Sequence, residues 1–374
     1  MTMSWSVFCR VVDNYGDIGV CWRLARQLHL EYDEQVTLWV DDLVAFGHIA
    51  PVRADAEEQL LEGVRICHWH AAAQPADDAD VVIEAFACEL PASQKAAMRA
   101  RSVTPVWLNL EYLSAEDWVI SCHGMASPQG GGLTKYFFFP GFAPGTGGVL
   151  AEQRMLAARA AWTTQDRFAL LAGLGVARPD ITTLSLFAYE NSAIADLIGQ
   201  LRASGEPVNL LVPMGRALPQ VAAAIGHGTL TPGQHVQVDA LNIYTVPMLP
   251  QHRYDQLLWS CDLNFVRGED SFVRAQHAMH PSVWHIYPQD DAAHEIKLEA
   301  FVDRYTRHWP AQDAQVLRAF WLAWNRGALV PGQWALLRAL LPQWQGYART
   351  WSARLDALGN LAGNLVKFAK TKLK

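Results

Sequence analysis

The chain has 374 residues, of which 51% are apolar and 18% are charged, and its formal net charge is −7. This length and apolar content suit two domains of ordinary size with buried cores and exclude a disordered protein. The acidic balance argues against a general nucleic-acid-binding protein, which would carry a basic stripe. The six cysteines form no Cys-x-x-Cys pair, and we expect them to be reduced core residues.

The start of the chain shows no targeting pattern. Residues 1–5 lead directly into a strand and lack the basic and then apolar layout of a signal peptide. No apolar run is long enough to span a membrane. We therefore expect a cytoplasmic protein that acts without a membrane.

The first half of the chain alternates apolar strands with helices. Residues 6–12 form the first strand, and an amphipathic helix pattern begins near Val20. The later elements of this half are strands at 35–40, 64–69, 80–86 and 106–111 and a helix at 91–101. Apolar strands separated by helices are typical of a parallel sheet that is covered on both faces.

The turn between the first strand and the first helix carries two carboxylates, Asp13 and Asp17. Ligands of open α/β sheets bind beyond the carboxyl ends of the strands, where this turn lies. Two acids there indicate proton chemistry or a cationic substrate rather than a phosphate site. The structural alternative is that Asp13 ends the strand and Asp17 caps the helix.

Residues 127–148 contain two stretches rich in glycine and proline around the aromatic run 136–139. A long loop inside a folded domain is often functional, but its aromatic residues can also pack an irregular connection. Helices at 149–162 and 165–174 follow.

The pattern restarts near residue 178, which predicts a second domain. It begins with a strand at 181–188, a helix at 191–203 and a strand at 208–212. The later elements are helices at 254–261 and 271–279, strands at 263–266 and 282–286, and a last helix from near Trp351 towards Leu373. Two successive doubly wound domains define a cleft, as in dehydrogenases, periplasmic binding proteins and GT-B glycosyltransferases, so this outline alone does not assign a function.

A second cluster of polar residues follows the strand at 263–266. Gly268 allows a tight turn, and a helix begins at Asp270 or Ser271. A helix N-terminus beside the charge of Arg267 suits a diphosphate. Glu269 would repel that ligand, unless it accepts hydrogen bonds from sugar hydroxyls or orients an arginine. The structural alternative is a capped helix with a surface Arg–Glu pair.

Three other features could line the same site. Tyr189 and Tyr287 each follow a predicted strand, and the proline-shaped turn at 246–251 could hold a flat base. Tyr189 could also be a simple aromatic residue at a strand end.

Cofactor motifs are weak. The segment Cys67-His68-Trp69-His70 offers too few ligands at usable spacing for a metal, and the Asp-x-Asp at 78–80 reads as a solvated turn. No GxGxxG follows the first strand, and no GxxxxGK[ST] occurs, which disfavours a nucleotide-dependent oxidoreductase and a P-loop protein. We expect no metal and no cofactor.

The two clusters lie in stretches that resemble one known family. DNYGDIGVCWRLARQL, FFPGFAPGTGG, PMLPQHRYDQLLWSCDLNFVRGEDSFVRAQ and IYPQDD are similar, in this order, to the EarP family of bacterial protein-arginine rhamnosyltransferases. The resemblance runs from the first strand to the final helix.

The resemblance implies an α/β fold of GT-B type, with two Rossmann-like doubly wound domains that face each other across a cleft. Residues 1–178 would bind the acceptor and be joined by the C-terminal helix 354–374, and residues 179–353 would bind the nucleotide sugar. It also implies an inverting, metal-independent transfer of L-rhamnose from dTDP-β-L-rhamnose to one arginine of elongation factor P, bound through its KOW-like N-terminal domain. The modification activates this factor for relief of ribosome stalling at polyproline.

The family's functional residues carry over by matching position. Asp17 is the implied general base, Asp13 the second essential carboxylate and Glu269 a further acidic residue needed for activity. The implied donor-binding residues are Tyr15, Gly16, Tyr189, Met248, Leu249, Pro250, Gln251, Gln256, Arg267, Gly268, Asp270, Ser271 and Tyr287. Met248 stands where the family pattern has an aromatic residue, and its thioether can still pack on a base.

Two rivals to this interpretation remain open. The first is a GT-B glycosyltransferase with another nucleotide sugar or acceptor. The second is a non-catalytic two-domain protein that binds a nucleotide sugar.

Overall fold

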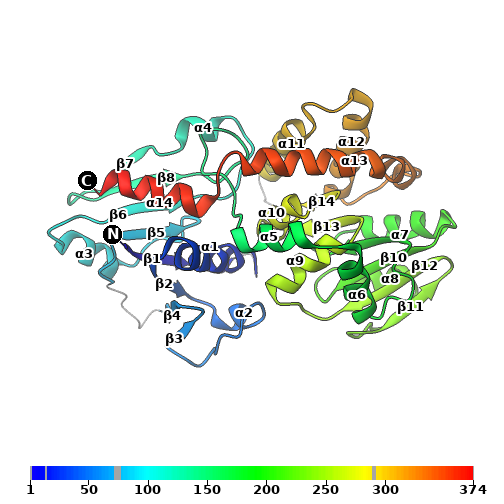
Figure 1. Ribbon diagram of the computed structural model, residues 1–374, viewed down its shortest axis with the longest axis horizontal. Helices are drawn as coiled ribbons and strands as arrows, with labels where there is room; N and C mark the ends of the chain where they lie inside the picture. The colour runs from blue at the N-terminus through cyan, green and yellow to red at the C-terminus, as the bar shows by residue number, and fades with distance from the viewer. Residues whose placement is uncertain (1, 13–14, 71–76, 289–291, 374) are drawn as a thin grey trace. The chain divides into compact units, whose positions relative to one another are not determined.

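The computed structural model describes residues 2–12, 15–70, 77–288 and 292–373. The chain divides into two compact units, the first made of Met1–Gln153 and Leu355–Lys374 and the second of Arg154–Arg354. Residues 154–178, which the sequence analysis grouped with the first domain, therefore lie in the second unit. In Figure 1 the red C-terminal helix α14 lies among the blue and cyan elements of the first unit.

The first unit is built on a mainly parallel sheet. In the described part of the chain this sheet has eight strands, in the order β3-β4-β2-β1-β5-β6-β8-β7. Only the outermost pairs, β3–β4 and β7–β8, are antiparallel. The strands are β1 (Ser4–Cys9), β2 (Gln35–Val40), β3 (Glu58–Leu61), β4 (Val64–His68), β5 (Val81–Ala85), β6 (Val106–Leu110), β7 (Ala126–Pro128) and β8 (Thr134–Phe138). Five of the six residues of β1 are buried, as a central parallel strand requires.

Helices cover the sheet of the first unit. They are α1 (Gly16–Tyr32), α2 (Leu43–Gly47), α3 (Ala92–Ala100), α4 (Trp118–Cys122) and α14 (Leu361–Lys372). Helix α1 packs on β1, β2 and α14, and the Tyr32 hydroxyl donates a hydrogen bond to Asn360 Oδ1 at 3.0 Å. The C-terminal helix is thus part of the same core as the first helix.

The second unit repeats the plan with a smaller sheet. Across the described residues this sheet has six strands in the order β11-β12-β10-β9-β13-β14, with only β11–β12 antiparallel. The strands are β9 (Thr182–Leu186), β10 (Val208–Pro213), β11 (His235–Val238), β12 (Leu241–Val246), β13 (Leu263–Arg267) and β14 (Ser282–His285).

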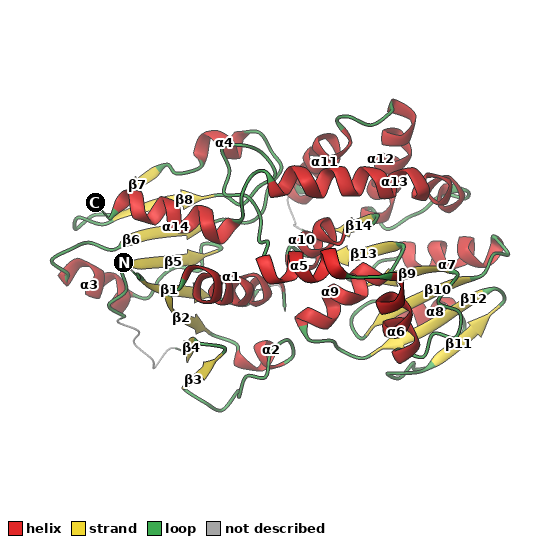
Figure 2. Ribbon diagram, viewed as in Figure 1, coloured by secondary structure: helices red, strands yellow, loops and turns green. Residues whose placement is uncertain are grey.

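Figure 2 shows the helices of the second unit in red around its yellow strands. They are α5 (Gln153–Ala161), α6 (Thr164–Gly173), α7 (Ala193–Ala203), α8 (Leu218–Ala224), α9 (Gln251–Ser260), α10 (Asp270–Ala278), α11 (Ala293–Thr306), α12 (Ala311–Asn325) and α13 (Gln333–Asp356). The predicted alternation of strands and helices and the α/β fold are confirmed.

Each sheet has a point where the strand order reverses. In the first unit, β1 pairs with β2 on one side and with β5 on the other side. In the second unit, β9 lies in the same way between β10 and β13. Loops that leave neighbouring strands in opposite directions open a crevice at the carboxyl ends, which is where doubly wound folds bind ligands. The two polar clusters follow β1 and β13, at these reversal points.

The segment 127–148 is more regular than the sequence indicated. Residues of the aromatic run form β8, which pairs antiparallel with β7 and parallel with β6. Gly130, Gly131 and Gly132 all have positive φ, so they close the tight connection between β7 and β8. The irregular-loop interpretation was therefore wrong for these strands, because aromatic residues fit a half-buried sheet edge well.

The single last helix predicted from Trp351 is interrupted. Helix α13 ends at Asp356, and α14 begins at Leu361. Gly359 has φ +74°, which ends the helical path, and the Asn360 side chain caps α14 by accepting from Gly363 N at 2.8 Å. The interruption places α14 in the first unit.

Most of the tryptophans are packing residues. Trp321, Trp324, Trp334 and Trp344 are fully buried in the second unit, and Trp344 Nε1 donates to the Tyr305 hydroxyl at 2.9 Å. The cysteines are free, and all except Cys122 are buried. Among the described residues, no helix combines the length and the apolar character needed to cross a membrane.

Candidate active site

One candidate site, in the first unit, is the turn after β1. Helix α1 begins at Gly16, so Asp17 lies in its first turn and is not the residue that precedes it. Its Oδ2 atom accepts a hydrogen bond from Val12 N at 2.8 Å, and the side chain is almost fully buried. Asp17 therefore ties the turn back onto the strand end, where its charge also benefits from the helix dipole.

Neighbouring groups hold this turn in place. Val11 N donates to Asp41 Oδ1 at 2.8 Å, which joins the end of β1 to the residue after β2. The Tyr15 ring lies edge-on to His48, with centroids 5.7 Å apart. Asp13, the second predicted carboxylate, lies outside the described residues.

The Cys9 thiol, at the end of β1, is held neutral. A hydrogen bond with Cys21, together with burial, raises the pKa of Cys9 well above its ordinary value, and the charge of Asp17 raises it further. The Cys9 side chain therefore adds no negative charge near the Asp17 carboxylate.

A second candidate site, in the second unit, is centred on Arg267, the last residue of β13. Its guanidinium carbon lies 4.7 Å from the Phe187 ring centroid and 4.6 Å from that of Tyr189. The residue is 6% exposed, and its Nη1 atom has no hydrogen-bond partner among the described residues. A buried cation with an unused donor is costly unless a ligand supplies an acceptor, and phosphate oxygens are suited to that role.

The turn from β13 into α10 places a helix N-terminus beside this arginine. Gly268 has φ +59°, a conformation that glycine adopts at little cost, and α10 begins two residues later. The Ser271 hydroxyl donates to Arg267 O and accepts from Arg267 N, so it fixes the turn. Glu269 precedes the helix, and Asp270 is its first residue.

Aromatic residues from the neighbouring strand ends surround Arg267. Tyr189 contacts both His285, with centroids 5.3 Å apart, and Tyr287, with centroids 5.5 Å apart. Tyr189, Arg267 and Tyr287, which the sequence predicted as site residues, thus lie together at the carboxyl ends of β9, β13 and β14.

Burial and the nearby charge of Arg267 lower the pKa of His285 to about 4. Burial similarly lowers the pKa of His280 to about 4. In the unfolded chain a histidine titrates near 6.5, so the unfolded state binds more protons between pH 6.5 and 4. Both groups therefore contribute stability that is complete above pH 6.5 and is lost as the pH falls towards 4.

We expect the free energy of unfolding of the wild type to fall across this window, as measured by urea denaturation at several pH values. His285→Gln removes one of the two groups and should give a shallower dependence on pH. Equal slopes for the variant and the wild type would contradict the assignment.

The predicted base-binding segment follows β12. Met248 and Leu249 are half-buried, Pro250 precedes α9, and Gln251 is the buried first residue of that helix. Gln256, further along α9, accepts a hydrogen bond from Arg253 Nη1 at 2.7 Å. The segment reaches the arginine site through Tyr254, whose ring contacts Phe187 with centroids 5.5 Å apart.

Helices α9 and α10 are fixed to each other by a buried ion pair. Arg274 Nε and Nη2 donate to the two carboxylate oxygens of Asp255 at 3.0 and 2.9 Å, and both side chains are almost fully buried. This pair aligns the helix that follows the base segment with the helix that follows Arg267.

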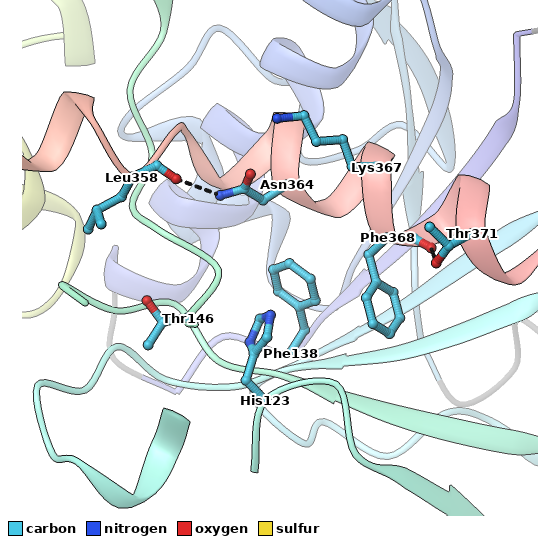
Figure 3. Close-up of a pocket in the computed structure, with 8 residues that line it drawn as sticks. All are labelled: His123, Phe138, Thr146, Leu358, Asn364, Lys367, Phe368 and Thr371. Carbon is cyan, nitrogen blue, oxygen red and sulfur yellow. Dashed lines mark hydrogen bonds between the residues drawn. The ribbon is translucent and has the colours of Figure 1, made fainter. Parts of the chain in front are cut away.

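A cavity of about 330 Å³ lies elsewhere in the first unit (Figure 3). It is lined by His123, Phe138, Thr146, Leu358, Asn364, Lys367, Phe368 and Thr371. Figure 3 shows the Asn364 amide bonded to the Leu358 carbonyl across one end, at 3.3 Å. Burial lowers the pKa of His123 below its ordinary value. The lining contains none of the predicted site residues.

Sequence reasoning missed several residues around Arg267. Phe187 and His285 were read as strand residues, and the Asp255–Arg274 pair was not predicted. The spacing of Phe187 and Tyr189 was an available signal, because residues two apart beyond a strand can lie on the same side. The ion pair joins two helices and leaves no local pattern.

Comparison with known proteins is consistent with this geometry. Residues 5–370 match the family model described as Elongation-Factor P (EF-P) rhamnosyltransferase EarP. A protein-arginine rhamnosyltransferase of Pseudomonas aeruginosa is 51% identical over 373 residues, which cover 98% of this chain and 98% of the relative.

Two solved structures bear on the fold. One, described as the structural basis for EarP-mediated arginine glycosylation of translation elongation factor EF-P, is 35% identical and covers 99% of both chains with a TM-score of 0.71. The glycosyltransferase VinC in complex with dTDP is 14% identical, covers 99% of this chain and 100% of its own, and has a TM-score of 0.54, which shows similarity of fold alone. The two-unit α/β architecture is that of GT-B glycosyltransferases.

Proposed function

The chain belongs to the EarP family of EF-P rhamnosyltransferases, and from this premise we propose that it transfers L-rhamnose from dTDP-β-L-rhamnose to an arginine of elongation factor P. The observation that carries the donor half of the proposal is the buried Arg267, with its unused Nη1 donor beside the N-terminus of α10. As the proposed acceptor is a translation factor, we place the reaction in the cytoplasm.

In the proposed donor site, Arg267 and the α10 N-terminus bind the diphosphate. Negative charge grows on this leaving group as its bond to the sugar breaks, and both groups offer a fixed positive potential. Gly268 allows the backbone to approach the phosphates closely, Ser271 holds the turn, and Asp270 follows at the first helical position. We therefore propose a transfer that needs no metal.

Aromatic and amide groups hold the two ends of the donor. Tyr189 lies beside Arg267 and contacts Tyr287. Both tyrosines would pack on the sugar, since aromatic rings offer an apolar face with a polar hydroxyl. The thymine would lie on the segment Met248–Gln251, with Gln256 on the same helix. The thioether of Met248 would pack on the thymine ring, where an aromatic side chain would otherwise stack. Glu269 would accept hydrogen bonds from sugar hydroxyls or orient an arginine.

In the proposed acceptor site, Asp17 and Asp13 receive the arginine of elongation factor P, with Tyr15 and Gly16 in the same turn. A guanidinium is protonated at physiological pH, because its pKa is roughly 12.5–13.8, and so it is a poor nucleophile. One carboxylate can hold the planar fork through two hydrogen bonds. The other can accept a proton as the nitrogen attacks. We assign the holding role to Asp13 and the base role to Asp17.

The proposed transfer is a single displacement at C1 of the rhamnose. The guanidinium nitrogen forms a bond to C1 of the rhamnose, and the bond from C1 to the diphosphate oxygen breaks with its electron pair going to dTDP. The proton lost by the nitrogen goes to Asp17. Attack opposite the leaving group converts the β-linked donor into an α-linked product. Positive charge develops at C1 in the transition state, as in glycoside hydrolysis.

Replacement of Arg267 tests the donor site. We expect Arg267→Ala to weaken dTDP binding at least about 30-fold, which corresponds to about 2 kcal/mol, because a buried charge contact to the diphosphate is lost. Calorimetry with dTDP measures the change, and a thermal melt checks that the variant is folded. Arg178→Ala, which removes an exposed arginine paired with Asp180, is the matched control and should bind dTDP normally. Unchanged dTDP affinity in Arg267→Ala would refute the diphosphate role.

Release of nucleotide tests the reaction and its rivals. We expect dTDP release only when the enzyme, dTDP-β-L-rhamnose and elongation factor P are all present. Turnover with another nucleotide sugar in place of dTDP-rhamnose would favour a different GT-B activity. Tight donor binding with no turnover for any acceptor would favour a non-catalytic binding protein.

A further inference from the structure

A cluster of nitrogen and oxygen ligands lies at the outer edge of the first sheet, apart from the proposed reaction chemistry. The carboxylate of Glu57 and the imidazoles of His68 and His70 place one ligand atom each within 4.8 Å of one another. His70 Nε2 lies 2.9 Å from Glu57 Oε2, and the two imidazole centroids are 4.9 Å apart. The sequence predicts no metal site at residues 67–70, because this segment offers too few ligands at usable spacing.

The fold supplies a further ligand, Glu57, because the register of β3 and β4 brings it next to the histidines. In the antiparallel pair β3–β4, Glu58 is opposite Cys67, and His68 N donates to Glu57 O at 2.9 Å, so Glu57 is opposite His68. Opposed residues in an antiparallel pair point to the same face of the sheet. His68 and His70 are two residues apart, so they share that face as well, whereas Cys67 points to the other face and is buried.

The second nitrogen of His68 is already oriented. His68 Nε2 lies 3.2 Å from the Asp41 carbonyl oxygen, which can only accept, so Nε2 carries the proton and Nδ1 presents a lone pair. Metal-bound histidines commonly donate their other ring N–H to a carbonyl in this way, which fixes the ring and raises its basicity.

We propose that Glu57, His68 and His70 form a binding site for a divalent transition metal, with Zn²⁺ as the best fit. Two imidazoles and one carboxylate are a ligand set that Zn²⁺ accepts with tetrahedral geometry, leaving a fourth position for water. Such a geometry needs ligand atoms roughly 3.4 Å apart, from metal–ligand distances of roughly 2.0–2.2 Å. The three ligand atoms lie within 4.8 Å of one another, and Glu57 is exposed while the imidazoles are half-buried, so metal binding requires these side chains to rotate towards one another. Mg²⁺ prefers an all-oxygen octahedral site and is not expected to bind here.

The site is connected to the catalytic turn by hydrogen bonds. The Asp41 carbonyl accepts from His68, and the Asp41 carboxylate accepts from Val11 N. The next residue, Val12, donates its N–H to Asp17. A metal that fixes His68 therefore fixes a residue one step from the turn that carries Asp17. Metal binding does not depend on the proposed function, because it is measured without the nucleotide sugar and without elongation factor P.

Calorimetric titration of the chelator-treated full chain with Zn²⁺ tests the inference. We expect one saturable site per chain. Glu57→Gln and His70→Gln should each lower the affinity at least about tenfold, because loss of a residue that only hydrogen-bonds to a metal ligand already costs about 10–100-fold in metal affinity. His235→Gln, which removes a surface histidine stacked on Tyr244 in the second unit, is the matched control and should bind like the wild type.

Co²⁺ in place of Zn²⁺ gives a second measurement that identifies the ligands. A spectrum typical of nitrogen and oxygen ligands, without a thiolate charge-transfer band, supports the site. Absence of saturable Zn²⁺ binding, a thiolate band, or equal affinity in the wild type, Glu57→Gln and His70→Gln would each overturn the proposal.

Discussion

Asp17→Asn is expected to lower kcat for rhamnosyl transfer by about 10²–10⁴-fold, the usual contribution of a general base. Asparagine has the same shape and can still accept the hydrogen bond from Val12 N through its side-chain oxygen. The turn after β1 should therefore keep its structure, while the group that takes the proton from the attacking nitrogen is lost. Affinity for dTDP-β-L-rhamnose should change little, because most of the proposed donor-binding residues, Arg267 among them, belong to the other unit.

Single-turnover kinetics and donor calorimetry together separate these effects. Asp33→Asn is a matched control at the far end of the same helix, where the residue is exposed and has φ +56°, a conformation that asparagine tolerates. It should retain wild-type activity. Lost donor affinity in Asp17→Asn, or near-normal turnover, would exclude Asp17 as the base.

Arg274→Met is expected to destabilise the protein by about 3–5 kcal/mol, because it leaves the Asp255 carboxylate buried without its main counter-charge. For a unit the size of residues 154–354, this corresponds to a fall in Tm of about 6–20 °C. Thermal denaturation followed by circular dichroism measures the change.

Two further variants separate the buried pair from ordinary surface ion pairs. Arg202→Met breaks the partly exposed pair with Asp239 and should cost only about 0–1 kcal/mol. The double variant Arg274→Met with Asp255→Leu removes both charges and should recover most of the lost stability, since the desolvated carboxylate is gone. A double variant that is no more stable than Arg274→Met would contradict this account of the pair.

The sequence was sufficient for the fold and for much of the candidate site because their signals are local. Apolar runs separated by helical patterns predicted both parallel sheets, and the turns after residues 12 and 267 were found from their charged residues and glycines. The structure places Arg267, Tyr189 and Tyr287 together, as expected for residues that follow adjacent strands.

Features that depend on pairing between distant segments were missed. Glu57 lies opposite His68 because of the register of β3 and β4. Asp255 pairs with Arg274 because α9 packs against α10. β8 was taken for a loop because its glycine-rich and proline-rich flanks concealed a strand that is stabilised by pairing with β6. The roles of Asp13, Asp17 and Glu269 rest on the family resemblance and remain predictions.

The central claim is that this chain places rhamnose on one arginine of elongation factor P, and mass spectrometry of the acceptor tests it most directly. The acceptor is incubated with the enzyme and dTDP-β-L-rhamnose, weighed intact, and then fragmented to locate the modification. We predict an increase of one rhamnosyl group that is confined to a single arginine. At the same incubation time, the modified fraction should be far smaller with Asp17→Asn. An unmodified acceptor, or rhamnose on any other residue type, would contradict the account.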